Sequence, residues 1–146
     1  MRAVLQRVTS SSVEVDGEMV GQIQQGWLVL LGIGKNDTQA TAEYLADRCV
    51  KLRAFADENG KMNRSVQDVS GSILVVSQFT LYGDCLRSRR PGFDAAASPE
   101  IANELYLHFC SAIKSSGVPL STGVFQADMK VSLINDGPVT FVLEKE

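Results

Sequence analysis

The sequence is poor in the residues that most often hold metals or form crosslinks. It has one histidine and three cysteines among 146 residues, and no CxxC pair occurs. The three cysteines (Cys49, Cys85 and Cys110) are odd in number and lack CxxC spacing. This pattern predicts reduced, mostly structural thiols rather than a disulfide framework or a zinc site. No HExxH, EF-hand or Walker A pattern is present. We therefore predict no metal and no cofactor.

The single histidine, His108, lies in a predicted helix at the margin of its apolar stripe, three residues after Leu105. A Ser-His-Asp or Cys-His site would need this residue as its base. Nothing in the neighbouring sequence supports such an assembly. A half-buried packing histidine is the default interpretation.

Long apolar runs and excess positive charge are also missing. The longest apolar run, Trp27–Ile33, is too short to cross a bilayer, and the first fifteen residues lack a signal-peptide pattern. We therefore expect a cytoplasmic protein. The net charge of −3 argues against coating nucleic acid by bulk electrostatics. One local exception, Arg87, Arg89 and Arg90, could meet a few phosphates, although a solvated loop is the simpler alternative.

Composition and patterning predict one folded domain over residues 1–146. Hydrophobic residues make up 45% and charged residues 21% of the chain, which is typical of a globular protein. Alternation on both sides of Asp16-Gly17 predicts a hairpin, and the run 26–34 predicts a strand buried on both faces. The patterns also predict helices over about 38–52 and from Ser98-Pro99 to Ser116. We expect an α+β fold, with a layered or barrel-like, mostly antiparallel sheet and two main helices on one side.

The stretch "SQFTLYGD" is the best internal candidate for a site. The preceding strand is apolar through Val76 and then presents Ser77, Gln78 and Thr80. Hydroxyl and amide groups at the end of a strand are common in functional sites. If the strand continues, Gln78 and Thr80 share one face. The alternative is a strand that becomes an exposed edge.

The stretch "NDGPVT" has two interpretations. Asn135, Asp136 and Gly137 are preferred residues of a hairpin turn, after which Pro138 would open the last strand. The functional alternative requires a cis Gly137-Pro138 bond that presents backbone carbonyls to a ligand.

Together these motifs resemble those of the D-aminoacyl-tRNA deacylase family, also called D-tyrosyl-tRNA deacylase. "MRAVLQRVTSSSVEVDGEMVGQI", "SQFTLYGD", "RRPGFDAAASPEIANELYLHF" and "TGVFQADMKVSLINDGPVTFVLE" carry the resemblance, which extends over essentially the whole chain. Gly92 departs from the serine that is more usual in the RPxF motif.

The resemblance implies a homodimer with its active sites at the subunit interface. It also implies hydrolysis of the ester between tRNA and a D-amino acid, or mischarged glycine, while L-aminoacyl-tRNA is spared. The family's SQxT motif falls on Ser77, Gln78, Phe79 and Thr80. Its Gly-cisPro motif, which reaches into the partner's pocket, falls on Gly137 and Pro138.

A missing histidine base is compatible with this chemistry, because an aminoacyl ester is already activated. Thr80 without a base is a poor nucleophile. Our hypothesis is that backbone N–H groups near Phe79 and Thr80 bind the carbonyl oxygen, and that the ribose 2′-OH helps to activate water. Rigid carbonyls at Gly137-Pro138 would exclude L side chains. Two alternatives are a small-molecule D-amino acid esterase and a noncatalytic RNA-binding dimer module.

Overall fold

The structure is a computed structural model that describes all 146 residues. In chain order the elements are β1 (Arg2–Val15), β2 (Glu18–Ile23), β3 (Gly26–Gly32), α1 (Gln39–Lys51), β4 (Phe55–Ala56), β5 (Met62–Arg64), β6 (Ser72–Ser77), the 3₁₀ turn η1 (Phe79–Tyr82), α2 (Pro99–Ser115), β7 (Leu120–Thr122) and β8 (Lys130–Glu144).

Six strands form one mixed sheet in the order β2-β1-β3-β6-β7, and β8 pairs with the other edge of β1. The pairs that β1 makes with β2, β3 and β8 are antiparallel, whereas β3, β6 and β7 run parallel. Ser121 Oγ of β7 donates to the Gln22 carbonyl of β2 at 3.1 Å, so the sheet nearly closes into a barrel. The predicted α+β, barrel-like, mostly antiparallel architecture is confirmed.

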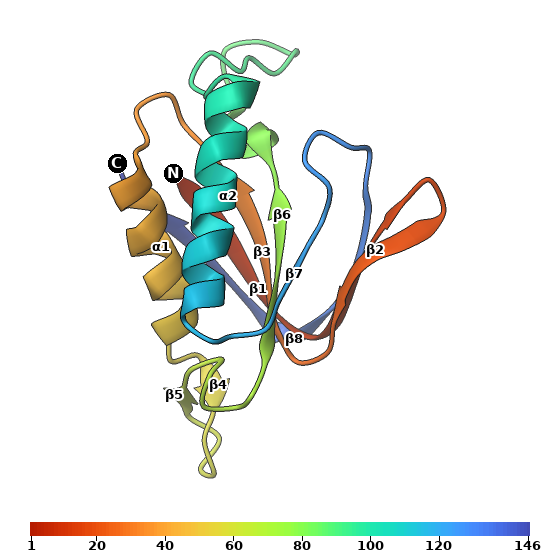
Figure 1. Cartoon of the computed structure of the whole chain (residues 1–146), viewed down its shortest axis with the longest axis vertical. Helices are drawn as coiled ribbons and strands as arrows, with labels where there is room; N and C mark the ends of the chain where they lie inside the picture. Colours follow the sequence, from red (N-terminus) through yellow and green to blue (C-terminus); the bar gives the residue numbers. More distant parts are fainter.

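Both helices cover the same face of the sheet and lie side by side (Figure 1). Thr38 caps α1, its Oγ1 accepting from the Thr41 backbone N–H at 3.3 Å, and Pro99 is the first residue of α2. Proline suits this position because its missing N–H would have no helical partner there. Both predicted helices are confirmed. Because α1 connects β3 to β6 and α2 connects β6 to β7, these neighbouring strands run parallel. The hairpin patterns in the sequence did not predict parallel pairs.

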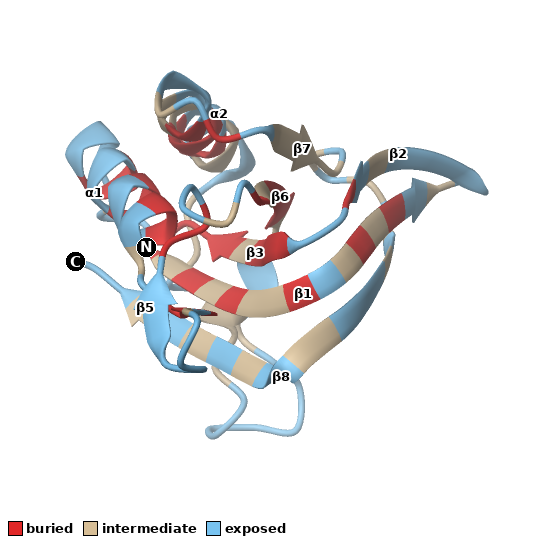
Figure 2. Ribbon diagram, turned by 90° about the horizontal axis from the view of Figure 1, so that it is seen from below, coloured by how far each residue is buried: buried red, intermediate tan, exposed pale blue.

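The main core contains 23 buried residues between the sheet and the helices, among them Trp27, Phe55 and Phe109. Buried and partly exposed residues alternate at the start of β1 (Figure 2), so that Ala3 and Leu5 face this core. All three cysteines are free; Cys49 and Cys110 are buried and Cys85 is exposed. None of the helices is long and apolar enough to span a membrane.

The chain departs from the predicted strand after Ser77. β6 ends there, and Phe79–Tyr82 form a 3₁₀ turn. The Gln78 N–H donates to the Leu31 carbonyl at 2.8 Å, after which the turn crosses the end of β3. A Cβ at Gly32 would lie 3.0 Å from the Gln78 oxygen, so glycine permits this crossing. The strand does not continue past Ser77, so the condition under which Gln78 and Thr80 would share a strand face is not met.

The predicted hairpin at Asn135–Gly137 is also wrong. β8 runs through "NDGP" as one 15-residue strand that pairs with β1 on both sides of this segment. The register shifts twice, between Gln6 and Val8 and between Val8 and Ser10, so the segment forms an irregularity within a continuous pair. Pairing along the 14-residue β1 overrides the local turn preference, because a bulge absorbs additional residues without reversing the chain.

Candidate active site

A cavity of about 610 Å³ opens where the parallel strands β3 and β6 end. It is lined by Leu31, Ile33, Val76, Ser77, Gln78, Phe79, Phe93, Ala96, Ala97, Pro99, Ala102, Phe125, Gln126, Ala127, Met129 and Val131. None of these residues has an ionisable side chain. A mostly apolar pocket with a few polar groups is typical of a small-ligand site.

The "SQFT" motif forms one wall of this cavity. Ser77, Gln78 and Phe79 line it, while Thr80 is the next residue of η1 and is exposed. The Gln78 side-chain Nε2 donates to Thr80 Oγ1 at 2.5 Å. An amide N–H donor cannot accept a proton from the Thr80 hydroxyl, so this contact does not activate Thr80 as a nucleophile.

Two aromatic rings form another part of the lining. The ring centroids of Phe79 and Phe93 are 4.9 Å apart, and the residues are 58% and 38% exposed. Phe93 was not among the predicted site residues, because no local pattern in "RRPGF" marks it as part of a cavity. Its role in the lining depends on a contact between separate loops.

The loop between β7 and β8 contributes Phe125, Gln126, Ala127 and Met129 to the cavity. Gln126 has a φ of +64°, a left-handed conformation that is uncommon outside glycine. β7 ends at Thr122, so these four residues lie outside the sheet. The sequence did not predict these lining residues, because no turn signal marks Gln126.

Gly137 and Pro138 lie on the exposed part of β8, and the peptide bond between them is cis. The Asn135 side chain holds this segment. Its Nδ2 donates to Gln6 Oε1 at 2.9 Å and to Thr140 Oγ1 at 3.0 Å, and its Oδ1 accepts from the Val139 N–H at 2.8 Å.

Arg7 provides a second anchor for the segment. Its Nε donates to the Asp136 carbonyl at 3.1 Å and its Nη1 to the Ala54 carbonyl at 2.6 Å. No residue of the stretch 135–140 lines the 610 Å³ cavity. Within one chain, the structure therefore does not bring the two motifs together.

The predicted arginine cluster lies on an exposed loop. Its base is closed by two backbone hydrogen bonds between Asp84 and Gly92, of 2.8 and 3.0 Å. Arg87 pairs with Asp84 at 3.1 Å, whereas Arg89 and Arg90 make no ion pair. A Cβ at Gly92 would meet nothing within 4 Å, so the serine more usual in the family would fit.

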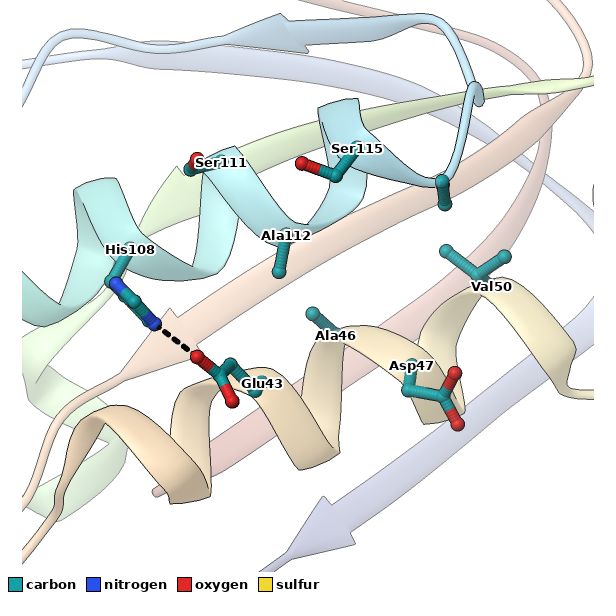
Figure 3. A pocket seen from close by; sticks show the side chains of 9 residues that line it. Glu43, Ala46, Asp47, Val50, His108, Ser111, Ala112 and Ser115 are labelled. Carbon is teal, nitrogen blue, oxygen red and sulfur yellow. Dashed lines mark hydrogen bonds and ion pairs between the residues drawn. The ribbon is translucent and has the colours of Figure 1, made fainter.

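His108 lies away from the "SQFT" cavity. Its Nε2 is 2.8 Å from Glu43 Oε1, across a separate cavity of about 450 Å³ between α1 and α2 (Figure 3). Its side chain is 30% exposed, which confirms the half-buried packing position. No group of three or more His, Cys, Asp or Glu side chains is arranged to hold a metal ion.

Residues 4–144 match the family described as D-Tyr-tRNA(Tyr) deacylase. The chain belongs to this deacylase family. It is 58% identical over 145 residues to the D-aminoacyl-tRNA deacylase of Pelobacter propionicus, which covers 99% of this chain and 100% of that protein.

Two solved structures resemble this deacylase family member. The c-Myc DNA Unwinding Element Binding Protein is 41% identical, with a TM-score of 0.94 over 100% of this chain and 99% of that one. A probable eukaryotic D-amino acid tRNA deacylase is 16% identical, with a TM-score of 0.82 over 97% of each chain. The second comparison shows a shared fold.

Proposed function

We infer that the protein hydrolyses the ester between a D-amino acid, or mischarged glycine, and the terminal adenosine of tRNA. Membership of the D-Tyr-tRNA(Tyr) deacylase family carries this inference. L-aminoacyl-tRNA is rejected, so the reaction serves chiral proofreading in translation. A tRNA substrate agrees with a cytoplasmic location.

The composition of the cavity supports a mechanism without a side-chain base. No lining residue is ionisable, and Gln78 donates to the Thr80 hydroxyl instead of removing its proton. The first residues of a helical turn have backbone N–H groups without a partner in that turn. In our proposal the N–H groups of Phe79 and Thr80 bind the carbonyl oxygen, and the substrate's 2′-OH helps to activate water.

Selection against L-amino acids is assigned to the backbone carbonyls of Gly137 and Pro138. The anchors from Asn135 and Arg7 limit the movement of this segment. A fixed carbonyl can crowd an L side chain while it accepts a hydrogen bond from the α-amino group of a D substrate. Glycine has no side chain to exclude, which accounts for its inclusion among the substrates.

These carbonyls can serve the cavity only if a second copy supplies them, so the proposal includes a homodimer. β8 is an edge strand that pairs with β1 on one side only. Its exposed residues include Ile134 and Val142, which are 60% and 66% accessible. A long edge strand with exposed apolar side chains favours association.

The loop that carries Arg87, Arg89 and Arg90 is proposed to contact tRNA phosphates. Its three exposed cations are a local exception to the net charge of −3. If the proposal holds, replacing the arginines by glutamine should weaken tRNA binding and flatten its salt dependence, because fewer counterions are released.

One assay tests the activity. The purified protein is incubated separately with D-Tyr-tRNA, L-Tyr-tRNA, glycine charged on tRNA and a free D-tyrosine ester, and release of the amino acid is followed. We expect turnover of the first and third substrates only.

The alternatives give different results. Comparable turnover of the free ester would indicate a small-molecule D-amino acid esterase. Binding of D-Tyr-tRNA without turnover would indicate a noncatalytic RNA-binding dimer module. In the same assay, complete loss of activity in Thr80→Ala with normal cleavage of a 2′-deoxy substrate would contradict the mechanism.

A further inference from the structure

The turn η1 has little packing of its own. It consists of four residues, Phe79–Tyr82, and none of them is buried. Short 3₁₀ turns have poorer hydrogen-bond geometry than α-helices, so an exposed one depends on contacts from outside. Below it, β3 ends in glycine, which permits the turn to lie against that strand. A Cβ at Gly32 would come within 3.0 Å of Leu81 Cβ.

Arg2 of β1 makes three contacts, two with η1 and one with β8. Its Nη1 donates to the Leu81 carbonyl at 2.8 Å, and its guanidinium carbon lies 4.5 Å from the centre of the Tyr82 ring. Its Nε pairs with Glu144 at the end of β8. A planar guanidinium can donate at its edge and stack on an aromatic face at the same time.

We propose that Arg2 is a positioning residue that holds η1, and with it the backbone N–H groups of Phe79 and Thr80, in the orientation required for ester hydrolysis. The catalytic part of this inference rests on the proposed function. Arg2 does not line the cavity, so it acts through the turn. Through Glu144, it also links η1 to the strand that carries Gly137 and Pro138.

The Tyr82 ring is suited to the stacking contact with the Arg2 guanidinium. Partial burial, followed by the nearby Asp37 charge, raises the pKa of Tyr82 to about 12, which is further above physiological pH than the ordinary value near 10. The same ring packs over Gly34, where a Cβ would lie 2.8 Å from three of its atoms. Arg2 of β1 and Gly34 in the segment between β3 and α1 therefore restrain Tyr82, the last residue of η1, from two sides.

The test compares Arg2→Met with Arg48→Met. Arg48 also stacks on a tyrosine, Tyr44, at 5.2 Å, but both residues are exposed on α1 and do not contact η1. Arg2→Met should lower kcat for D-Tyr-tRNA by about 10- to 100-fold, as expected for misplaced reacting groups, with KM changed less than about threefold. Arg48→Met should retain wild-type kcat.

Amide hydrogen exchange on the free protein provides a readout that needs no substrate. The Leu81 and Gly83 amides donate within the turn, at 3.2 and 2.9 Å. In Arg2→Met they should exchange about tenfold faster, while amides in β6 remain unchanged, because only the turn is released.

In Arg2→Met, unchanged hydrogen exchange at the Leu81 and Gly83 amides would overturn the inference. Unchanged kcat, or faster hydrogen exchange throughout the molecule, would overturn it as well. If the wild-type protein released no amino acid from D-Tyr-tRNA, the proposed function would fail. Hydrogen exchange would still decide whether Arg2 holds the turn.

Discussion

Gly137 occupies a backbone position that other residues adopt with difficulty. Its φ is +136°, and a Cβ would lie 2.6 Å from Val139 Cγ2 and 3.2 Å from Arg7 Nη2. An L side chain at such a φ is strained, and this residue is part of the proposed chirality filter. Adding a single methyl group at Gly137 therefore tests the role of this residue in the filter.

The added methyl group of Gly137→Ala should shift the carbonyls of the filter. We therefore expect this variant to reduce the preference for D-Tyr-tRNA over L-Tyr-tRNA, or to lower D-Tyr-tRNA hydrolysis, by about tenfold or more. Comparison of kcat/KM for the two substrates measures the effect. Gly60→Ala is the matched control, because Gly60 has a φ of +75° with nothing within 4 Å. Equal D over L preference and equal rates in both variants would contradict the assigned role of Gly137.

The residues of the site differ in how far the sequence revealed them. Ser77 and Gln78 stand out because an apolar strand becomes polar there, and the structure places both at the cavity. Phe93 and Gln126 carry no such local signal. They line the cavity because separate loops meet at the ends of β3 and β6, which periodicity does not encode.

At the scale of elements, the sequence predicted both helices well and the last strand poorly. Thr38 caps the start of α1, Pro99 opens α2, and both helices have apolar residues at helical spacing. In β8, by contrast, "NDGP" favours a turn locally, and only its pairing with the distant β1 reveals a continuous strand. Long-range pairing of this kind overrides short-range turn preference.

Asp37 joins three parts of the chain. Its Oδ1 accepts from the α-amino group of Met1 at 2.5 Å, and its Oδ2 from the Gly34 N–H at 2.6 Å. The Met1 amine also donates to the Lys145 carbonyl at 2.7 Å. The side chains of Met1 and Asp37 are 0% and 4% exposed, so this ion pair is buried.

Asp37→Asn should lower the free energy of unfolding by about 3 kcal/mol, because it leaves a buried ammonium without its counter-charge. Urea denaturation measures the change. Asp47→Asn, which removes an exposed ion pair with Lys51, should cost less than about 1 kcal/mol. A similar small loss in both variants would show that the Met1–Asp37 pair contributes little.

At the scale of the molecule, the two motifs are separate within one chain, and the proposed dimer reunites them. A mixed dimer can test this arrangement. In one subunit, Ala127→Trp fills the cavity; in the other, Gly137→Ala alters the filter. The Ala127→Trp homodimer should be inactive, and the Gly137→Ala homodimer should show the reduced selectivity or the reduced D-Tyr-tRNA hydrolysis described above; the mixed dimer is compared with both for whichever property is lost.

If the cavity and the filter of one site come from different subunits, as proposed, a mixed dimer of these variants should have one intact site. Random mixing after co-expression should restore about a quarter of wild-type turnover, since half of the dimers are mixed and each has one good site. Turnover no greater than the average of the two parent variants would indicate that each site is built from one chain.

The absence of ionisable side chains around the cavity has a consequence for the pH–rate profile. The lining supplied by one chain offers no acid or base to the reacting atoms and therefore imposes no protonation equilibrium on turnover. Between about pH 6 and 8, His108→Gln should leave the profile superimposable on the wild type, because His108 does not line this cavity. Any inflection in that range would then belong to the α-amino group of the substrate, so the pH dependence of turnover would report on the substrate and not on the enzyme.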